Sequence, residues 1–154
     1  MINHRHTQGF TLIEVLIALV ILAIGLLGMA TLMMNSLQSS QGAYQRSQAS
    51  LLTYDLLERM RANHDQAVTT DDYVMGKDDN IPSDPGCKAN GCSPRAQAQQ
   101  DLHDWRTALE EGLPDAKASI ERENDNEYTI EIEWQEAGLA DDTPPPTFSL
   151  RVDL

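Results

Sequence analysis

The chain has 154 residues, which is enough for one small domain and an additional segment but not for two independent cores. Its 24 acidic residues against 11 basic ones give a formal net charge of -13, so binding to nucleic-acid phosphates or to an anionic lipid surface would need a local basic patch. The sequence contains no such patch, and we therefore expect no nucleic-acid partner.

The first predicted element is a long apolar helix near the N-terminus. From Phe10 to Met34 only Glu14 is charged, and about 20 apolar residues are enough for a helix to span a bilayer. Arg5 lies upstream of this run, whereas the first base after it is Arg46. The positive-inside rule therefore predicts a membrane span with a cytoplasmic N-terminus and a polar head on the other side of the membrane.

A secretory signal peptide is the alternative interpretation of the same segment. The small residues Gly28 and Ala30 form a cleavage pattern that would release a protein beginning at Thr31. The apolar run is, however, longer than the usual signal-peptide core of about 7 to 15 residues, and Glu14 would have no purpose inside such a core. These two features favour a retained anchor.

Glu14 is unusual in an apolar run because an acid inside lipid costs about 2.5 to 3.5 kcal/mol at the bilayer centre, and less near the interface. It could stay hydrated near the interface or become protonated. If the chain were cleaved after Gly9, the new amine of Phe10 would lie about 6 Å along a helix from Glu14, since each residue rises about 1.5 Å. Cleavage would thus provide a cationic partner for the acid.

The helix is predicted to continue well beyond the apolar run. Residues 35–62 contain no proline, and their apolar residues recur at spacings compatible with one helical face, so one helix is predicted over about 10–62. The predicted apolar face of the second half consists of Leu37, Tyr44, Leu51, Leu52, Leu56, Leu57 and Met60.

Residues 63–92 are predicted to form a polar loop because they contain acids, Gly and Pro without a sustained period. Carboxylates are preferred calcium ligands, so a calcium site is one hypothesis for this segment. The spacing matches no EF-hand loop, and a solvated acidic loop is the favoured interpretation. The acids concerned are Asp71, Asp72, Asp78, Asp79 and Asp84.

Cys87 and Cys92 enclose the short turn K-A-N-G and are the only cysteines of the chain. A zinc site would need two further ligands, for which His64 and His103 are the nearby nitrogen candidates. A structural disulfide in an oxidising compartment is favoured, and because its loop is small it would contribute only about 2 kcal/mol. The C-x4-C spacing differs from that of redox-active C-x-x-C motifs.

A second helix is predicted over about 94–111. Ser93 suits the N-cap, Pro94 suits the first helical position, and Gly112 is the expected stop. The apolar residues of this segment share one face, and they are Ala98, Leu102, Trp105 and Leu109.

The C-terminal third is predicted to form a small antiparallel meander. Apolar and polar residues alternate around residue 130, a weaker strand precedes them at 116–122, and a third follows at 148–154. We expect an α+β fold in which one sheet face packs on the long helix and the acidic face meets solvent. The apolar residues of the central strand are Tyr128, Ile130, Ile132 and Trp134.

The segment G-F-T-L-I-E at residues 9–14 resembles the class III signal of type IV pilins and the related pseudopilins. This resemblance implies a pilin-like fold. It also implies that prepilin peptidase cleaves between Gly9 and Phe10 on the cytoplasmic side and N-methylates Phe10, while the apolar helix is retained. Glu14 would then be an assembly residue.

A finer resemblance concerns L-A-I-G-L-L-G, R-M-R-A-N and the W…L…L-P pattern around Trp105, which are similar to the PilV group of minor pilins. It implies an inner-membrane subunit that primes a type IV pilus or is incorporated into the fibre. Its implied partners are other minor and major pilins and the inner-membrane assembly machinery. The expected organisation is a leader at 1–9, a transmembrane and assembly helix at 10–34, its continuation at 35–62 and a periplasmic head at 63–154.

Other functions remain open at this stage. A type II secretion pseudopilin can carry an identical N-terminal signature, and the head could instead be a ligand receptor at a pilus tip. We expect no enzyme, cofactor or metal site, because no nucleophile with a base, carboxylate pair or ligand cluster occurs at a recognisable spacing. A membrane-tethered periplasmic enzyme would need a cleft that the sequence does not show.

Overall fold

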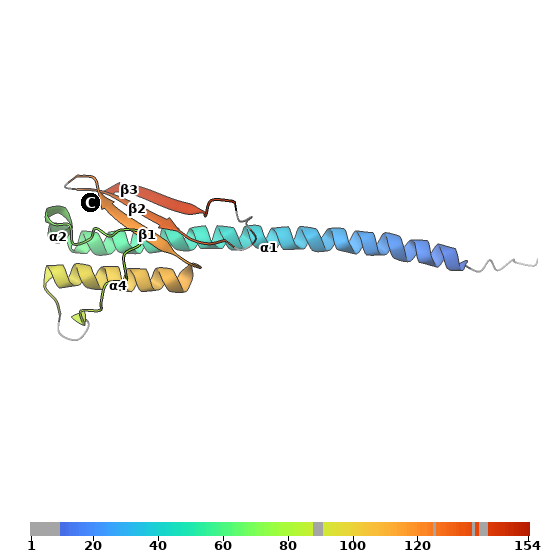
Figure 1. Ribbon diagram of the computed structural model, residues 1–154, viewed down its shortest axis with the longest axis horizontal. Helices are drawn as coiled ribbons and strands as arrows, with labels where there is room; N and C mark the ends of the chain where they lie inside the picture. Colours follow the sequence, from blue (N-terminus) through green and yellow to red (C-terminus); the bar gives the residue numbers. More distant parts are fainter. Residues whose placement is uncertain (1–9, 88–90, 125, 137, 139–141) are drawn as a thin grey trace, which may run out of the picture. The chain divides into compact units, whose positions relative to one another are not determined.

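The computed structural model describes residues 10–87, 91–124, 126–136, 138 and 142–154 (Figure 1). The chain divides into two compact units, Met1–Ser40 and Gln41–Leu154. The predicted α+β fold is confirmed. The elements follow one another as α1 (Leu12–Ala62), α2 (His64–Thr69), α4 (Pro94–Gly112), β1 (Lys117–Arg122), β2 (Glu127–Glu133) and β3 (Thr147–Asp153).

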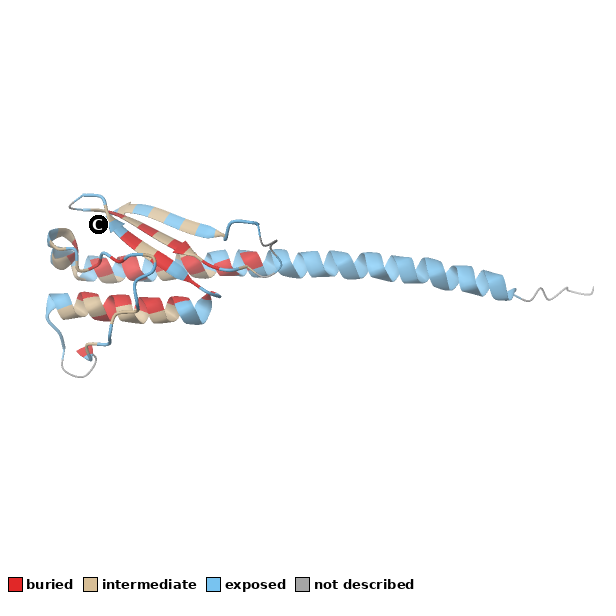
Figure 2. Ribbon diagram, in the orientation of Figure 1, coloured by how far each residue is buried: buried red, intermediate tan, exposed pale blue. Residues whose placement is uncertain are grey.

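The first unit consists of the apolar part of α1. The helix begins within two residues of the predicted start and continues without interruption through this unit. Every described residue from Phe10 to Ser40 is exposed, and even Leu12 and Leu27 are 88% and 69% exposed (Figure 2). The apolar surface of this unit is therefore not covered by any described part of the chain.

The second unit contains the sheet, an antiparallel meander in the order β1-β2-β3. Ile130 of β2 pairs with Ile120 of β1 on one side and with Leu150 of β3 on the other. The alternation predicted for β2 is confirmed, because Tyr128, Ile130, Ile132 and Trp134 are fully buried while the residues between them are half-exposed. The buried face of β2 thus forms the centre of the core of the head.

The buried face of α1 in the second unit agrees only in part with the predicted one, because Leu56, Leu57 and Met60 are buried as predicted. The prediction was wrong for Tyr44 and Leu51 of this unit, which are 61% and 60% exposed, and for Leu37 of the first unit, which is 63% exposed. Small or polar side chains take the remaining inner positions, and the small ones allow neighbouring elements to approach the helix closely. The buried positions of α1 are Gly42, Gln45, Ala49, Thr53, Leu56, Leu57 and Met60.

Helix α4 has the predicted signals at its start, whereas its C-cap is Leu113 and not the predicted Gly112. The Ser93 side chain accepts a hydrogen bond from the backbone N–H of Ala96 at 3.3 Å, Pro94 begins the helix, and the helix ends at Gly112. Trp105 of the buried face donates from Nε1 to the carbonyl of Leu52 on α1 at 3.0 Å. This bond ties α4 to the second half of α1, beside which it runs in Figure 1.

The prediction of a polar loop over 63–92 was partly wrong. The segment begins with the short helix α2, and its Tyr73 and Met75 are buried in the core. Met75 and Ile120 exchange two backbone hydrogen bonds of 3.0 and 2.8 Å, which continue the sheet at the outer edge of β1. Tyr73 and Met75 alternate over only two apolar positions, which is too short a run to give a sustained period in the sequence.

Candidate processing and assembly site

The start of α1 is built by a local cap at Thr11. The backbone N–H of Glu14 donates to Thr11 Oγ1 at 3.3 Å and to the Thr11 carbonyl at 3.1 Å. This side-chain cap gives a partner to one of the backbone N–H donors that the first turn of a helix otherwise leaves unpaired. The pattern T-L-I-E at 11–14 is the sequence signature of a capping box, and it could have predicted this role of Thr11.

The capping box is only half formed. In its complete form the acid at the third helical position would accept a hydrogen bond from the backbone N–H of the cap residue. Within the described residues, the carboxylate of Glu14 has neither this hydrogen bond nor an ion pair, and Glu14 is exposed. The side chain therefore remains available to a partner outside its own unit, in the first turn where the helix dipole favours an anion.

Phe10 and Glu14 lie on the same side of the helix. A shallow groove on this side is lined by apolar side chains apart from Glu14 itself, and Phe10 is 84% exposed. A carboxylate at this place attracts a cation more strongly once lipid or neighbouring helices exclude water from the groove. Gly9 lies outside the described residues. The groove is lined by Phe10, Glu14, Val15, Ala18, Leu19 and Leu22.

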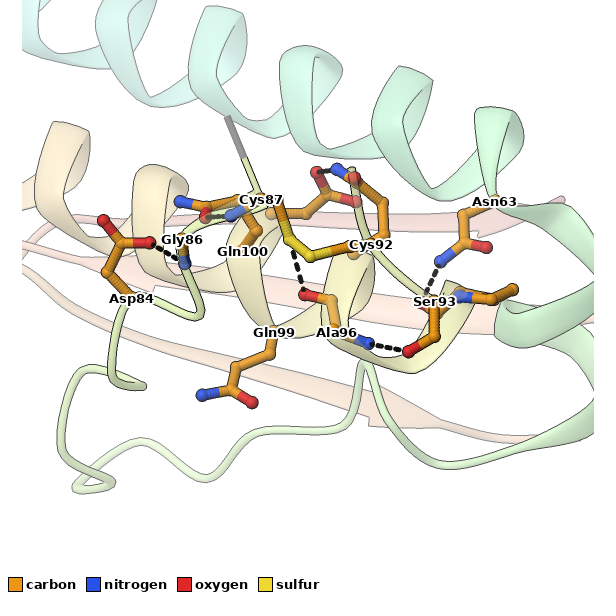
Figure 3. The surroundings of a disulfide bond; sticks show 12 residues. Asn63, Asp84, Gly86, Cys87, Cys92, Ser93, Ala96, Gln99 and Gln100 are labelled. Atoms are coloured by element: carbon orange, nitrogen blue, oxygen red, sulfur yellow. Dashed lines mark hydrogen bonds between the residues drawn. A yellow bond between two sulfur atoms is a disulfide. The ribbon is translucent and has the colours of Figure 1, made fainter. Parts of the chain in front are cut away.

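The predicted disulfide between Cys87 and Cys92 is present (Figure 3). Cys87 is nine-tenths buried, and its backbone N–H donates to Gln100 Oε1 of α4 at 3.2 Å. The hydrogen bond to Gln100 therefore holds Cys87 against α4, and the disulfide links it to Cys92 just ahead of that helix. Because the two sulfurs are bonded to each other, the thiolates that a zinc site would need are not available, and Nδ1 of His103 instead lies 2.7 Å from the Pro82 carbonyl.

The acids of the segment 63–92 have separate local partners rather than a common site. Asp78 pairs with Lys117 at 2.9 Å, Asp79 accepts from the Gly76 N–H at 2.6 Å, and Asp84 accepts from the Gly86 N–H at 2.7 Å. Asp71 pairs with Arg122, and Asp72 accepts from Gln66. Across the described ranges, no group of three or more His, Cys, Asp or Glu residues is placed to hold a metal ion.

Two family models match adjacent parts of the chain. The model of the prokaryotic N-terminal methylation motif matches residues 4–30, and the model of type IV pilin Tt1218 matches residues 31–103. The chain belongs to the type IV pilin family. The matched range of the first model contains the bond between Gly9 and Phe10 as well as Glu14, and the two models do not distinguish the PilV group within the pilins. Neither a curated protein nor a solved structure matches the chain.

The type IV pilin family is structural rather than catalytic. The methylation motif implies processing by prepilin peptidase and assembly with other pilins. Among the described helices, α1 is long and apolar enough to cross a membrane, with a mean hydropathy of 2.8 over 18 residues. Together with the class III signal, this helix points to membrane anchoring and to incorporation into a pilus.

Proposed function

We propose that this pilin is a minor subunit of the PilV type that primes assembly of a type IV pilus or is incorporated into its fibre. The observation that carries the proposal is an uncovered apolar helix whose first turn holds a carboxylate, Glu14, without a partner among the described residues. Such a surface is stable only in lipid or against other apolar helices.

Processing prepares the helix for assembly. Prepilin peptidase cleaves between Gly9 and Phe10 and N-methylates the new N-terminus of Phe10, which removes the leader 1–9. Residues 10–34 then act as transmembrane and assembly helix, 35–62 as its continuation and 63–154 as the periplasmic head. The distribution of Arg5 and Arg46 around the apolar run supports this orientation in the inner membrane.

Assembly is a change of surroundings for the helix. When the subunit leaves the bilayer, its apolar surface is buried against the helices of neighbouring pilins. The Phe10 amine of one subunit and the Glu14 carboxylate of the next then form an ion pair that sets the axial register. Removing one member of such a pair is costly because the other charge stays desolvated and unpaired.

Substitution of Glu14 tests this proposal in cells that make pili. Glu14→Ala and Glu14→Gln should lower the recovery of the subunit in sheared pili by about tenfold or more, because an unpaired charge in the fibre costs several kcal/mol. Total protein and cleavage should stay near wild-type levels. Glu58→Ala is the matched control, since this exposed acid lies in the head part of α1 and pairs there with Arg61. Normal recovery of both Glu14 variants would contradict the proposed role.

The mass of the mature protein tests the processing step separately. A species that begins with N-methylated Phe10 supports the proposed cleavage. A species that begins at Thr31 would reject it in favour of secretion, and an uncut chain would leave a plain membrane anchor. Recovery of the subunit with a secretion pseudopilus rather than with sheared type IV pili would identify it as a type II secretion pseudopilin, and specific ligand binding by the head would support a receptor role at a pilus tip.

A further inference from the structure

Arg106 of α4 is a buried cation with few partners. The residue is 6% exposed, its Nη1 donates to the Ala116 carbonyl at 3.4 Å, and its Nε is buried without a hydrogen-bond partner. No acid forms an ion pair with it in the part of the chain that the structure describes. A guanidinium has five N–H donors, and a buried charge without compensation is strongly unfavourable.

Other arginines of the head contrast with Arg106. Arg59 pairs with Asp55 at 2.8 Å, Arg61 pairs with Glu58 at 2.7 Å, and Arg151 pairs with Glu127. The side chains of these three arginines are 34%, 45% and 63% exposed, so water could solvate them even without an acid. Arg106 differs from these three arginines in being both buried and without an acidic partner among the described residues.

Arg106 lines an open pocket of about 730 Å³ in the head. The pocket lies between residues 77–81, α4 and the residues that lead into β1. Its other cations are already engaged, because Lys77 is bonded to Glu133 and Lys117 pairs with Asp78 at 2.9 Å. An incoming anion would therefore find its free donors on the guanidinium of Arg106.

The acids of the pocket restrict the charge of that anion. Asp79, Glu110 and Asp115 line the pocket as well, and none of the three forms an ion pair within the described ranges. They disfavour a dianion more than a monoanion, which argues against a phosphate ester. A carboxylate carries one negative charge, and its two oxygens match the planar fork of a guanidinium.

We propose that this pocket is a binding site for a carboxylate group, with Arg106 as its anion-binding residue. The site is independent of the Glu14 contact and belongs to the head alone. The carboxylate is supplied by a free small molecule or by an Asp or Glu side chain of a second copy of the chain.

The test uses the full chain in neutral detergent micelles, labelled with ¹⁵N-arginine. Sodium acetate is titrated against sodium chloride at constant ionic strength, while the Nε–Hε signal of Arg106 is followed by NMR. The signal should shift and saturate with acetate and should stay in place with chloride, and phosphate should bind more weakly than acetate. An equal or unsaturable response to acetate and chloride would overturn the proposal, as would tighter binding of phosphate.

Substitutions provide an independent check. Arg106→Gln keeps an amide donor for Ala116 but removes the charge, and it should weaken acetate binding by about tenfold or more, as measured by calorimetry. Arg95→Gln is the matched control, because this side chain on the same helix is 81% exposed. Acetate binding that survives in a folded Arg106→Gln chain would overturn the proposal. If that variant does not fold, the titration of the wild-type signal decides.

Serial dilution in the absence of acetate identifies the source of the carboxylate. A shift of the Arg106 signal with protein concentration means that a second copy supplies it. A signal that is independent of concentration but responds to acetate means that a free carboxylate does. Both results agree with a carboxylate at Arg106. Neither result depends on the recovery of Glu14 variants in sheared pili, so the two proposals are tested independently.

Discussion

At the scale of single residues, a buried polar network joins three parts of the head. The Tyr73 hydroxyl donates to Asp101 Oδ2 at 2.7 Å and accepts from Asn63 Nδ2 at 3.1 Å. Asp101, which is 2% exposed, also accepts from Gln97 at 2.8 Å and lies 3.6 Å from Arg59. Burial, and then the hydrogen bond to Asp101, raise the pKa of Tyr73 well above its ordinary value of 10.0. The network links the end of α1, the segment before Met75 and α4.

This raised pKa predicts a loss of stability at high pH. Above the ordinary tyrosine pKa of 10.0 the unfolded chain releases a proton that folded Tyr73 retains, so the free energy of unfolding falls as the pH rises from there towards the folded pKa. Tyr73→Phe should reduce this fall without abolishing it, because burial also raises the pKa of Tyr128. Thermal unfolding at about pH 8 and about pH 11 measures the effect.

Tyr73→Phe should also destabilise the head by about 1 to 2 kcal/mol near neutral pH, because Asp101 and Asn63 lose a partner. Tyr54→Phe is the control, since Tyr54 is 52% exposed. An identical pH dependence of wild type and Tyr73→Phe would show that Tyr73 ionises in the same way in the folded and unfolded chains.

At the scale of elements, β2 separates a packed face from a solvent face. Ile130 is fully buried, whereas the side chain of its neighbour Glu131 is 41% exposed and lies 3.8 Å from Lys77. Ile130→Ala should cost about 2 to 5 kcal/mol, because it leaves a cavity in the core of the head. Glu131→Ala should cost less than about 1 kcal/mol. Chemical unfolding of both variants measures the difference, and equal costs would contradict the packing described for this strand.

The disulfide closes a short loop just before α4. Replacing Cys87 and Cys92 together with Ala should lower the free energy of unfolding by at most about 2 kcal/mol, because the closed loop is small. Helix α4 should keep its helical content, because its Ser93 cap and Pro94 lie beyond the loop. Circular dichroism with and without a reducing agent checks this, and a loss of α4 in the variant would show that the disulfide carries more of the fold than its loop size predicts.

At the scale of the whole molecule, the packing core and the apolar helix belong to different units. The buried core residues lie in Gln41–Leu154, whereas the described residues of Met1–Ser40 are exposed. A fragment consisting of residues 41–154 should therefore fold in water without detergent, and its unfolding midpoint should lie close to that of the head in the full chain. Calorimetry of the two proteins measures this. A fragment without a cooperative transition would show that the first unit contributes to the fold of the head.

Much of this architecture was predictable because its signals are local. The apolar run and the absence of proline predicted α1, the Ser93–Pro94 pair and Gly112 predicted α4, and alternation predicted β2. The T-L-I-E pattern also contained the Thr11 cap, although that role was found only in the structure. Each of these features depends on residues within a few positions of one another, so propensity and spacing are sufficient to reveal it.

The features that were missed depend on contacts between distant segments. Three such features depend on which element lies opposite. They are the pairing of Met75 with Ile120, the inner position of Ala49 in place of Leu51, and the lack of an acidic partner for Arg106 among the described residues. The sequence by itself determined the anchor helix, the type IV pilin signature and the strand pattern, because those are carried by spacing along the chain. Only the tertiary structure decided which side chains are buried and which charges lack a partner, because burial and pairing are properties of neighbours in space.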